Sequence, residues 1–418
     1  MSRKAAKPKI AARERAAPAI KDDGEAVMMM MPALLSDEAK SKAELIDLTI
    51  DLVARSAGLR RSLPDGTLTA IAELVRVMNC YYSNLIEGHN THPIAIERAM
   101  RKNYDNDPRK RNLQKEAEAH VAVQRWIDGG GLSGRATTVD GICEIHRRFC
   151  AALPEDLLWV EVPDAGDKVR VVPGELRQAF VEVGNHEAVS PGAVPRFMKQ
   201  FQASYSRLGK AEATVSAAAA HHRLLWIHPF LDGNGRVTRL MSHATMLETL
   251  DTGALWSVAR GLGRNAATYK QHLANCDLGR RNDLDGRGNL SEETLAEFTS
   301  FFLKTCIDQV DFMEKLMEPN QLRARILSWA EDESKVGSLP AKAGHVLEAI
   351  LYRGELPRGD IPKLLQVTDR QALRVVNALS DRHVLTSPSS RAPWRLMFPA
   401  TLAHRWMPGL FPPETANN

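Results

Sequence analysis

A twelve-residue run, 228–239, reads His-Pro-Phe-Leu-Asp-Gly-Asn-Gly-Arg-Val-Thr-Arg and forces the chain to turn tightly between two helices. The alanine-rich stretch before it, 214–227, spaces its apolar residues as a buried helix does. Pro229 ends that helix, because the residue before a proline is disfavoured in the helical conformation. The Gly-Asn-Gly turn that follows can adopt positive φ angles, and 236–250 predicts the next helix. We therefore expect His228 at a helix end, pointing into a tight loop.

The same loop combines residue types that suit phosphate chemistry. Successive N–H groups in the Gly-Asn-Gly turn form an anion-binding nest, and the N-terminus of the next helix adds a favourable dipole. Arg236 and Arg239 share one face of its first turn, and their guanidinium groups match phosphate oxygens. Asp232 is a hard oxygen ligand of the kind that suits magnesium held mostly by phosphates and water. A neutral His228 can accept a proton from a hydroxyl near neutral pH.

Other kinds of site fit the sequence less well. The chain has no Gly-x-x-x-x-Gly-Lys-[Ser/Thr] segment, so a Walker-type nucleotide site is excluded. It also has no His-Glu-x-x-His or Gly-x-Ser-x-Gly motif. His221 and His222, with His228, suggest zinc, but their spacing lacks the i, i+4 geometry that places two ligands on one helix face. We interpret His221 and His222 as helix residues.

The run 228–239 resembles the full signature of Fic domains, H-P-F-x-[D/E]-G-N-G-R-x-x-R, at every fixed position. The resemblance implies transfer of AMP from ATP to a Ser, Thr or Tyr hydroxyl of a target protein, with pyrophosphate leaving. It assigns the base to His228, Mg²⁺ to Asp232, phosphate contacts to Gly233, Asn234 and Gly235, and the β and γ phosphates to Arg236 and Arg239. The arginines favour a triphosphate without choosing its base, so another nucleotide donor, or a phosphocholine group, stays open.

A second likeness concerns a β-hairpin that covers the site in this family, called the flap. Residues 171–177 followed by 181–186 resemble it, and the alternation in 180–183 supports a strand there. In the family the flap pairs with an extended segment of the target protein, which is β-strand addition. The resemblance, which covers 73–309, places Val183, Gly184, Asn185 and His186 beside the adenine. It also places Tyr269 in the nucleotide pocket, although many relatives have two adjacent tyrosines where this chain has Thr268-Tyr269.

A third likeness suggests a built-in inhibitor. Residues 83–88, Ser-Asn-Leu-Ile-Glu-Gly, follow a helical stretch at 68–82 and resemble the inhibitory motif [S/T]-x-x-x-E-[G/N] of Fic proteins. Its fixed positions are Ser83, Glu87 and Gly88. The resemblance implies that Glu87 pairs with Arg239 and occludes the γ-phosphate position. In several relatives this glutamate also positions a water that removes AMP, so the net direction of the reaction stays open.

The periodicity predicts a mainly α fold. The resemblance implies a Fic-type helical core with a β-hairpin flap, and a C-terminal winged helix-turn-helix follows it. We divide the chain into a disordered tail at 1–35, an N-terminal helical region carrying the inhibitory motif at 36–110, the Fic core at 111–317 and the winged helix at 320–418. Within the first three parts we expect no sheet beyond the flap. The expected helices are 39–56, 68–82, 94–104, 114–128, 139–153, 193–208, 215–227, 236–250, 266–276 and 292–317.

The C-terminal part resembles a winged helix-turn-helix because three short helices, at 344–352, 358–365 and 368–379, precede a hairpin at 385–398. Thr368 is a suitable N-cap for the third helix. In a DNA reader, side chains from this helix and the wing enter the major groove or hold phosphates. The candidates are Arg370, Gln371, Arg374, Arg391 and Arg395. The alternative is an interaction or dimerisation module, so a DNA-bound regulator with a nucleotide-sensing core and a homodimer both stay open.

Composition limits where such a chain works. Five cysteines, an odd and widely spread number, indicate reduced thiols in apparent helices. No stretch is long enough to span a membrane, and the apolar piece at 26–35 makes a poor signal peptide because acidic residues precede it. The net charge of +4 does not by itself argue for nucleic acid. We expect a cytoplasmic transferase that uses ATP and Mg²⁺.

Overall fold

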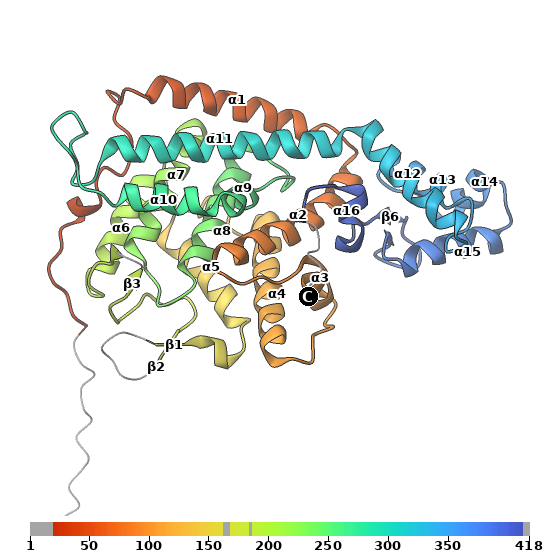
Figure 1. Ribbon diagram of the computed structural model, residues 1–418, viewed down its shortest axis with the longest axis horizontal. Coiled ribbons are helices and arrows are strands. Elements are labelled where there is room, and N and C mark those ends of the chain that lie inside the picture. The colour runs from red at the N-terminus through yellow and green to blue at the C-terminus, as the bar shows by residue number, and fades with distance from the viewer. Residues whose placement is uncertain (1–19, 162–167, 184–185, 413–418) are drawn as a thin grey trace, which may run out of the picture.

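The computed structural model describes residues 20–161, 168–183 and 186–412, and these are mainly helical (Figure 1). The α-helices are α1 Lys42–Arg60, α2 Asp65–Ile86, α3 Pro93–Met100, α4 Pro108–Asp128, α5 Val139–Ala151, α6 Val194–Tyr205, α7 Lys210–Ile227, α8 Asn234–Leu250, α9 Val258–Arg264, α10 Ala266–Cys276, α11 Glu292–Met317, α12 Pro319–Lys335, α13 Ala343–Arg353, α14 Ile361–Leu365, α15 Asp369–Asp381 and α16 Ala403–Trp406. Short 3-10 helices are η1 Val27–Met30, η2 Glu155–Leu158, η3 Arg358–Asp360 and η4 Ala400–Leu402.

The strands form three two-stranded antiparallel hairpins among the described residues. They are β1 Trp159–Glu161 with β2 Lys168–Arg170, β3 Glu182–Val183 with β4 His186–Glu187, and β5 Leu385–Thr386 with β6 Arg395–Leu396. The first hairpin was not expected, because the sequence predicts no sheet before 171 outside the flap. Each of its strands is only three residues long and mostly exposed, which is too short for alternation to signal a strand.

Helices α7 and α8 form the centre of the molecule, and α6, α5 and α11 pack around them. Helix α7 is buried on almost all sides, including the small residues 217–220. A helix buried on nearly all sides belongs in a core, and the alanine side chains of α7 let a neighbouring helix approach closely. Helices α1 and α11 lie side by side across one face of this pair (Figure 1). The loop between α7 and α8 is therefore held by two well-packed helices.

Residues 20–35 pack against the core, so the expected disorder up to residue 35 is wrong for this part of the chain. Met30 is fully buried, the Tyr205 hydroxyl donates to the Ala33 carbonyl at 2.6 Å, and the Arg223 guanidinium donates to the Pro32 carbonyl at 2.9 Å. Composition alone does not reveal such docking, because the residues that contact this segment lie far away in the sequence.

At one end of the molecule, α12 leads into a unit made of α13, α14, α15 and the β5–β6 hairpin (Figure 1). Its elements follow the order expected from the sequence, and Thr368 caps α15 in a capping box with Gln371. The interpretation of this unit as a winged helix stays a prediction. It touches the start of α2, where the Thr67 hydroxyl donates to the Leu351 carbonyl at 3.1 Å. Across the described residues, none of the helices combines the length and the apolar character needed to cross a membrane.

Candidate active site

His228 follows directly after α7 in a left-handed backbone conformation, with φ 50° and ψ 63°. A non-glycine residue is uncommon there, and such residues cluster at functional sites. Its backbone N–H still donates to the Leu224 carbonyl at 3.1 Å. Its Nδ1 lies 3.2 Å from the Leu225 carbonyl. Because a carbonyl only accepts, Nδ1 carries the proton, and Nε2 is left as the acceptor atom.

The surroundings of His228 keep its ring neutral. Burial lowers the pKa of His228 to about 4, and the charges of Arg177 and His186 act in the same direction. The bond to Leu225 and the charge of Glu87 oppose that shift. At neutral pH the ring is therefore available as a base. The expected position of His228 at a helix end agrees with the structure.

The loop after His228 is held in shape from within. Gly233 has φ 81°, the left-handed conformation that its lack of a side chain allows. The Asn234 side chain donates to the Phe230 carbonyl at 2.8 Å and accepts from the Phe230 N–H at 2.9 Å. The amide of Asn234 thus closes the loop, and what it offers a phosphate is backbone N–H at the start of α8. A Cβ on Gly235 would collide with a carboxylate oxygen of Glu87, so a larger residue there would displace the Glu87 side chain.

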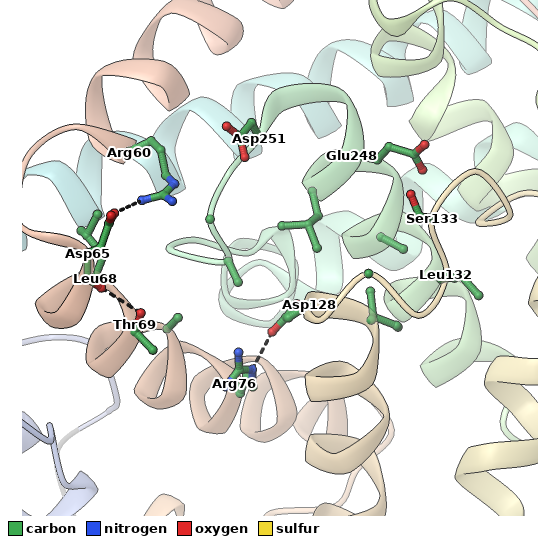
Figure 2. Close-up of a pocket in the computed structure, with 17 residues that line it drawn as sticks. Arg60, Asp65, Leu68, Thr69, Arg76, Asp128, Leu132, Ser133, Glu248 and Asp251 are labelled. Carbon is green, nitrogen blue, oxygen red and sulfur yellow. Dashed lines mark hydrogen bonds and ion pairs between the residues drawn. The ribbon is translucent and has the colours of Figure 1, made fainter. Parts of the chain in front are cut away.

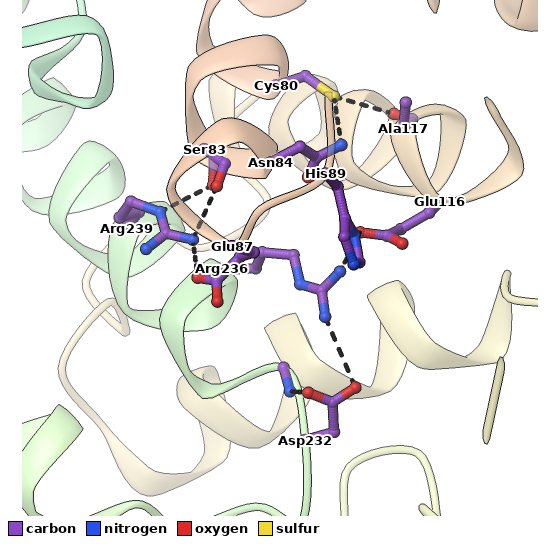
Figure 3. Close-up of polar contacts among 11 residues, drawn as sticks. Cys80, Ser83, Asn84, Glu87, His89, Glu116, Ala117, Asp232, Arg236 and Arg239 are labelled. Carbon is purple, nitrogen blue, oxygen red and sulfur yellow. Dashed lines mark hydrogen bonds and ion pairs between the residues drawn. The ribbon is translucent and has the colours of Figure 1, made fainter. Parts of the chain in front are cut away.

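Glu87, at the end of α2, pairs with Arg239 of α8 (Figure 3). Arg239 is almost fully buried, and it also donates to the hydroxyl of Ser83 at 2.8 Å and to the carbonyl of Ser83 at 3.1 Å. Burial alone would raise the pKa of Glu87, but the charges of Arg239 and Arg236 outweigh it and hold the pKa of this carboxyl below its usual range. Glu87 is therefore ionised at neutral pH and forms an ion pair with Arg239.

Arg236, one turn earlier on α8, is paired with a different carboxylate. Figure 3 shows its guanidinium between Glu116 of α4 and Asp232 of the loop. It forms an ion pair with Glu116 and lies 3.6 Å from Asp232. Glu116 also accepts from His89 Nδ1 at 3.0 Å. The charges of His89 and Arg236 hold the pKa of Glu116 below its usual range despite its burial, which by itself raises it.

Neither Glu116 nor His89 was singled out from the sequence. Glu116 lies within the predicted helix 114–128, next to Lys115, and reads as part of a solvated helix face. The available signal was that Leu113 and Ala119 lie three residues before and after Glu116, so part of this helix face is apolar. A carboxylate on an apolar face needs a buried cation as its partner.

Asp232 is the candidate ligand for a metal ion. Its side chain is about half exposed, and one oxygen accepts from the Gly233 N–H at 2.6 Å. No cluster of three or more His, Cys, Asp or Glu side chains able to hold a metal occurs in the described residues. A single exposed carboxylate fits magnesium, which usually takes one or two protein carboxylates and completes its shell with phosphate oxygens and water.

The flap expected at 171–186 is shorter than the sequence suggests. Residues 171–177 form turns and extended segments, and the hairpin is confined to Glu182–Val183 and His186–Glu187. Val183 pairs with His186, and Gly184 and Asn185 lie outside the described residues. The His186 ring donates from Nε2 to the Trp226 carbonyl at 2.8 Å. This bond ties the hairpin to the last turn of α7, directly before His228.

Tyr269, expected in the nucleotide pocket, is buried inside the helical core. Its hydroxyl lies 2.6 Å from His221 Nε2, and His221 Nδ1 lies 2.8 Å from the Ser242 hydroxyl. Burial raises the pKa of Tyr269 to about 12. Tyr269 thus contacts α7 through His221, and its hydroxyl also interacts with Arg239 of α8. His222 contacts Asp277 at 3.0 Å, so both histidines act as packed helix residues.

A separate hollow of about 440 Å³ lies between the first half of α2, the end of α4 and the end of α8 (Figure 2). Its charged rim is largely paired, since Arg60 contacts Asp65 at 3.2 Å and Arg76 contacts Asp128 at 2.5 Å. It contains none of the predicted site residues. The chemistry is therefore concentrated around the α7–α8 loop and not in this hollow.

Comparison with known proteins agrees with this placement. Residues 136–246 match the model of the Fic/DOC family. The chain contains a Fic domain. The match includes the whole run from His228 to Arg239 as well as Arg177, whereas Glu87, Glu116 and Tyr269 lie outside it.

Curated relatives of this Fic domain include two proteins named protein adenylyltransferase Fic. The one from Drosophila grimshawi is 27% identical over 170 residues, covering 40% of this chain and 32% of that protein. The one from Drosophila willistoni is 28% identical over 172 residues, covering 40% of this chain and 31% of that protein. The similarity thus spans about a third of the length of these relatives.

A solved structure extends the likeness in fold. The crystal structure of a Fic family protein from Desulfovibrio desulfuricans matches with a TM-score of 0.50 at 16% identity, covering 87% of this chain and 98% of that chain. The fold is therefore the mainly helical fold of a Fic protein over most of its length. Identity this low carries no information on substrate.

Proposed function

We propose that this chain is a protein adenylyltransferase that transfers AMP from magnesium-bound ATP to a hydroxyl of a target protein. The observation that carries the proposal is that the α7–α8 loop brings together a base and groups that bind phosphate. A histidine with an unprotonated Nε2 lies next to a glycine turn at a helix N-terminus, and Arg236 and Arg239 follow within that helix. The adenylyltransferase names of the Drosophila relatives support it.

The reaction needs positioning and charge stabilisation more than covalent chemistry from the protein. The hydroxyl oxygen of the target attacks the α-phosphorus of ATP, and the bond from that phosphorus to the bridging oxygen of pyrophosphate breaks. The hydroxyl proton passes to Nε2 of His228. Arg236, Arg239 and the N–H groups at the start of α8 stabilise the charge on the departing pyrophosphate. A magnesium ion held by Asp232 would neutralise part of the phosphate charge.

We further propose that Glu87 inhibits this activity. Its carboxylate already occupies the Arg239 guanidinium, which the γ-phosphate of ATP needs for a productive pose. Two anions cannot share that guanidinium in a buried site without strong repulsion. A Glu87 carboxylate released from Arg239 would also be available to orient a water that removes AMP from a modified target, as the resemblance implies.

Target proteins would dock on the flap. The β3–β4 hairpin is short, and its bond from His186 to Trp226 fixes it next to His228. An extended target segment paired along this hairpin by backbone hydrogen bonds would bring a hydroxyl towards the base. Such pairing depends little on side chains, so the target sequence is not encoded in the flap.

Purified protein incubated with magnesium and α-phosphate-labelled ATP tests both proposals. Glu87→Gly should label itself or proteins of a lysate more strongly than wild type, and Glu87→Gly/His228→Ala should not. Glu73→Gln, which removes another ion-paired carboxylate of α2, should behave as wild type. Label that persists in the double variant would remove His228 from its role. Competition by unlabelled GTP, CTP and UTP identifies the preferred donor.

A second candidate function is DNA binding by the C-terminal unit. Arg370, Gln371 and Arg374 are exposed on α15, and neither arginine has an ion-pair partner among the described residues. By contrast, Arg395 of the hairpin is paired with Glu355 at 2.8 Å. Duplex DNA affinity that falls steeply with salt and is lost in Arg370→Ala/Arg374→Ala would establish this function. Affinity unaffected by these changes would favour an interaction module.

A further inference from the structure

Arg177 is a buried cation whose partners are backbone carbonyl groups. It lies between β2 and β3, and its side chain is only 2% exposed. Its Nε donates to the His228 carbonyl at 2.7 Å, and its Nη1 donates to the Ala179 carbonyl at 3.0 Å. Its Nη2 donates to the carbonyls of Val189 and, at 3.4 Å, Ile227. In the described part of the chain Arg177 forms no ion pair, and the carboxylate whose charge acts on it, Glu25, is itself paired with Arg196.

Two of these carbonyls belong to the end of α7. The last carbonyls of a helix have no partner within it and carry partial negative charge, so a cation placed there is favourable. Here the cation holds the carbonyl of His228 itself, the residue that leaves the helix in a left-handed conformation. The backbone N–H of Arg177 also donates to the Pro229 carbonyl at 2.9 Å. The start of the catalytic loop is therefore fixed at three successive residues, 227–229.

The other two carbonyls flank the flap. Ala179 precedes β3 and Val189 follows β4, so the guanidinium closes the base of the hairpin segment between them. A planar fork of five N–H donors can serve four carbonyls in different directions, whereas a lysine ammonium cannot hold that geometry. One side chain thus joins both ends of the flap to the residue that carries the base.

We propose that Arg177 is a positioning residue, which fixes the flap relative to Nε2 of His228 so that a docked target presents its hydroxyl to the base. This inference rests on the proposed adenylyltransferase function. It assigns Arg177 to alignment of the target and not to ATP, because none of its contacts involves Asp232, Arg236 or Arg239.

The charge of Arg177 supplies a readout that a purely structural residue would lack. Burial lowers the pKa of Arg177 to about 10, so it stays protonated at neutral pH. The titratable groups that face His228 are Arg177, His186 and Glu87, and the first two lower the pKa of His228. Removing Arg177 should raise that pKa, whereas Arg177→Lys, which keeps the charge, should raise it less.

The experiment compares Arg177→Ala and Arg177→Lys in the Glu87→Gly background. The substrate is the lysate protein that Glu87→Gly labels most strongly. We expect kcat/KM for this target to fall by about 100-fold, as for a misplacement of about 1 Å, while KM for ATP stays within about twofold. The acid limb of the pH–rate profile should move to higher pH in Arg177→Ala. Guanidinium ion at a non-denaturing concentration should restore part of the activity.

Arg223→Ala is the matched control. Like Arg177, Arg223 is buried and donates to a backbone carbonyl, that of Pro32. Arg223 lies within α7, away from the α7–α8 loop. It should lower the melting temperature without moving the pH limb. If Arg177→Ala shows only what Arg223→Ala shows, the proposal is overturned. If Arg177→Ala does not fold, Arg177→Lys must still show the loss of kcat/KM for the target with KM for ATP kept, and its absence overturns the proposal.

NMR of the 15N-labelled histidine side chains separates this inference from the proposed function. It reports the tautomer and pKa of His228 without any turnover. If Glu87→Gly labels no protein, the adenylyltransferase proposal fails by itself. A His228 whose tautomer and pKa are the same in wild type and Arg177→Ala refutes the positioning role, whatever the activity.

Discussion

Replacing Glu87 with glutamine removes the carboxylate that pairs with Arg239 and keeps the size of the side chain. Hydrogen bonds to charged groups are worth about 1.5–3 kcal/mol. If ATP must displace this pair to reach Arg239, losing it lowers the cost of binding by that amount. At 1.4 kcal/mol for each factor of ten, we expect ATP affinity to rise by about 10- to 100-fold, and transfer activity to rise with it.

Calorimetric titration of ATP with magnesium measures the affinity, and label transfer measures the activity. Glu87→Gln/His228→Ala should keep the gain in affinity and lose the transfer, because His228 acts on the hydroxyl and not on the phosphates. Glu73→Gln should change neither, since Glu73 forms ion pairs on the surface of α2. Wild-type ATP affinity in Glu87→Gln would refute the occlusion of Arg239.

Mild acid should not imitate this substitution. The pKa of Glu87 is held below its usual range, so the carboxylate protonates, and releases Arg239, only in acid. The pKa of His228 is about 4, so the base is protonated in the same acid range. Lowering the pH from 7 to 5 should therefore leave wild type inhibited, which a label-transfer assay across that range would show.

Three further predictions follow from other contacts. Glu116→Gln should weaken ATP binding and lower the melting temperature, because it leaves Arg236 buried without its carboxylate; unchanged calorimetric and thermal midpoints would contradict this. Gly66→Ala should destabilise the protein by about 1–3 kcal/mol, because the new Cβ would collide with the Gly354 carbonyl oxygen. In the control Gly58→Ala the new Cβ meets nothing within 4 Å. Equal urea midpoints for the two variants would argue against this prediction. Stability should fall as the pH drops from about 6.5 towards 4, because several buried histidines have folded pKa values near 3–4 against 6.5 for the unfolded chain. The unfolded state therefore takes up the protons, and each such histidine lowers the free energy of unfolding by about 1 kcal/mol at pH 5.5. Equal urea midpoints at pH 7.5 and 5.5 would contradict this. These histidines are His120, His146, His222 and His228.

The α7–α8 loop could be predicted in detail because its causes are local. Because of Pro229, α7 ends at Ile227 and His228 follows directly after it. The glycine turn allows α8 to begin at Asn234, two residues before the predicted start. Most core helices also follow from periodicity within a single segment. The α1 helix begins three residues after and ends four residues beyond its predicted limits, as is usual for helix ends.

What the sequence could not supply are partners that come from distant segments. Arg177 lies in a stretch that resembles the flap, and its role depends on carbonyls at 179, 189, 227 and 228, which carry no sequence signal. The burial of Tyr269 against His221 is of the same kind. The docking of residues 20–35 was not predicted, because their partners, such as Tyr205 of α6 and Arg223 of α7, lie far away in the sequence.

Glu87 and Glu116 each pair with an arginine of α8, but they differ in how freely they can leave it. This difference is why we propose that Glu87 inhibits ATP binding and that Glu116 holds Arg236 in place. The Glu87 side chain is 33% exposed, lies at the end of α2 and precedes Gly88, whose φ of 87° marks a turn. It can leave Arg239 without disturbing a helix. The Glu116 side chain is 5% exposed and lies in the middle of α4, so it cannot leave Arg236 unless part of that helix moves. Removing the first carboxylate should therefore strengthen ATP binding and removing the second should weaken it, although each neutralises one arginine of the same helix turn.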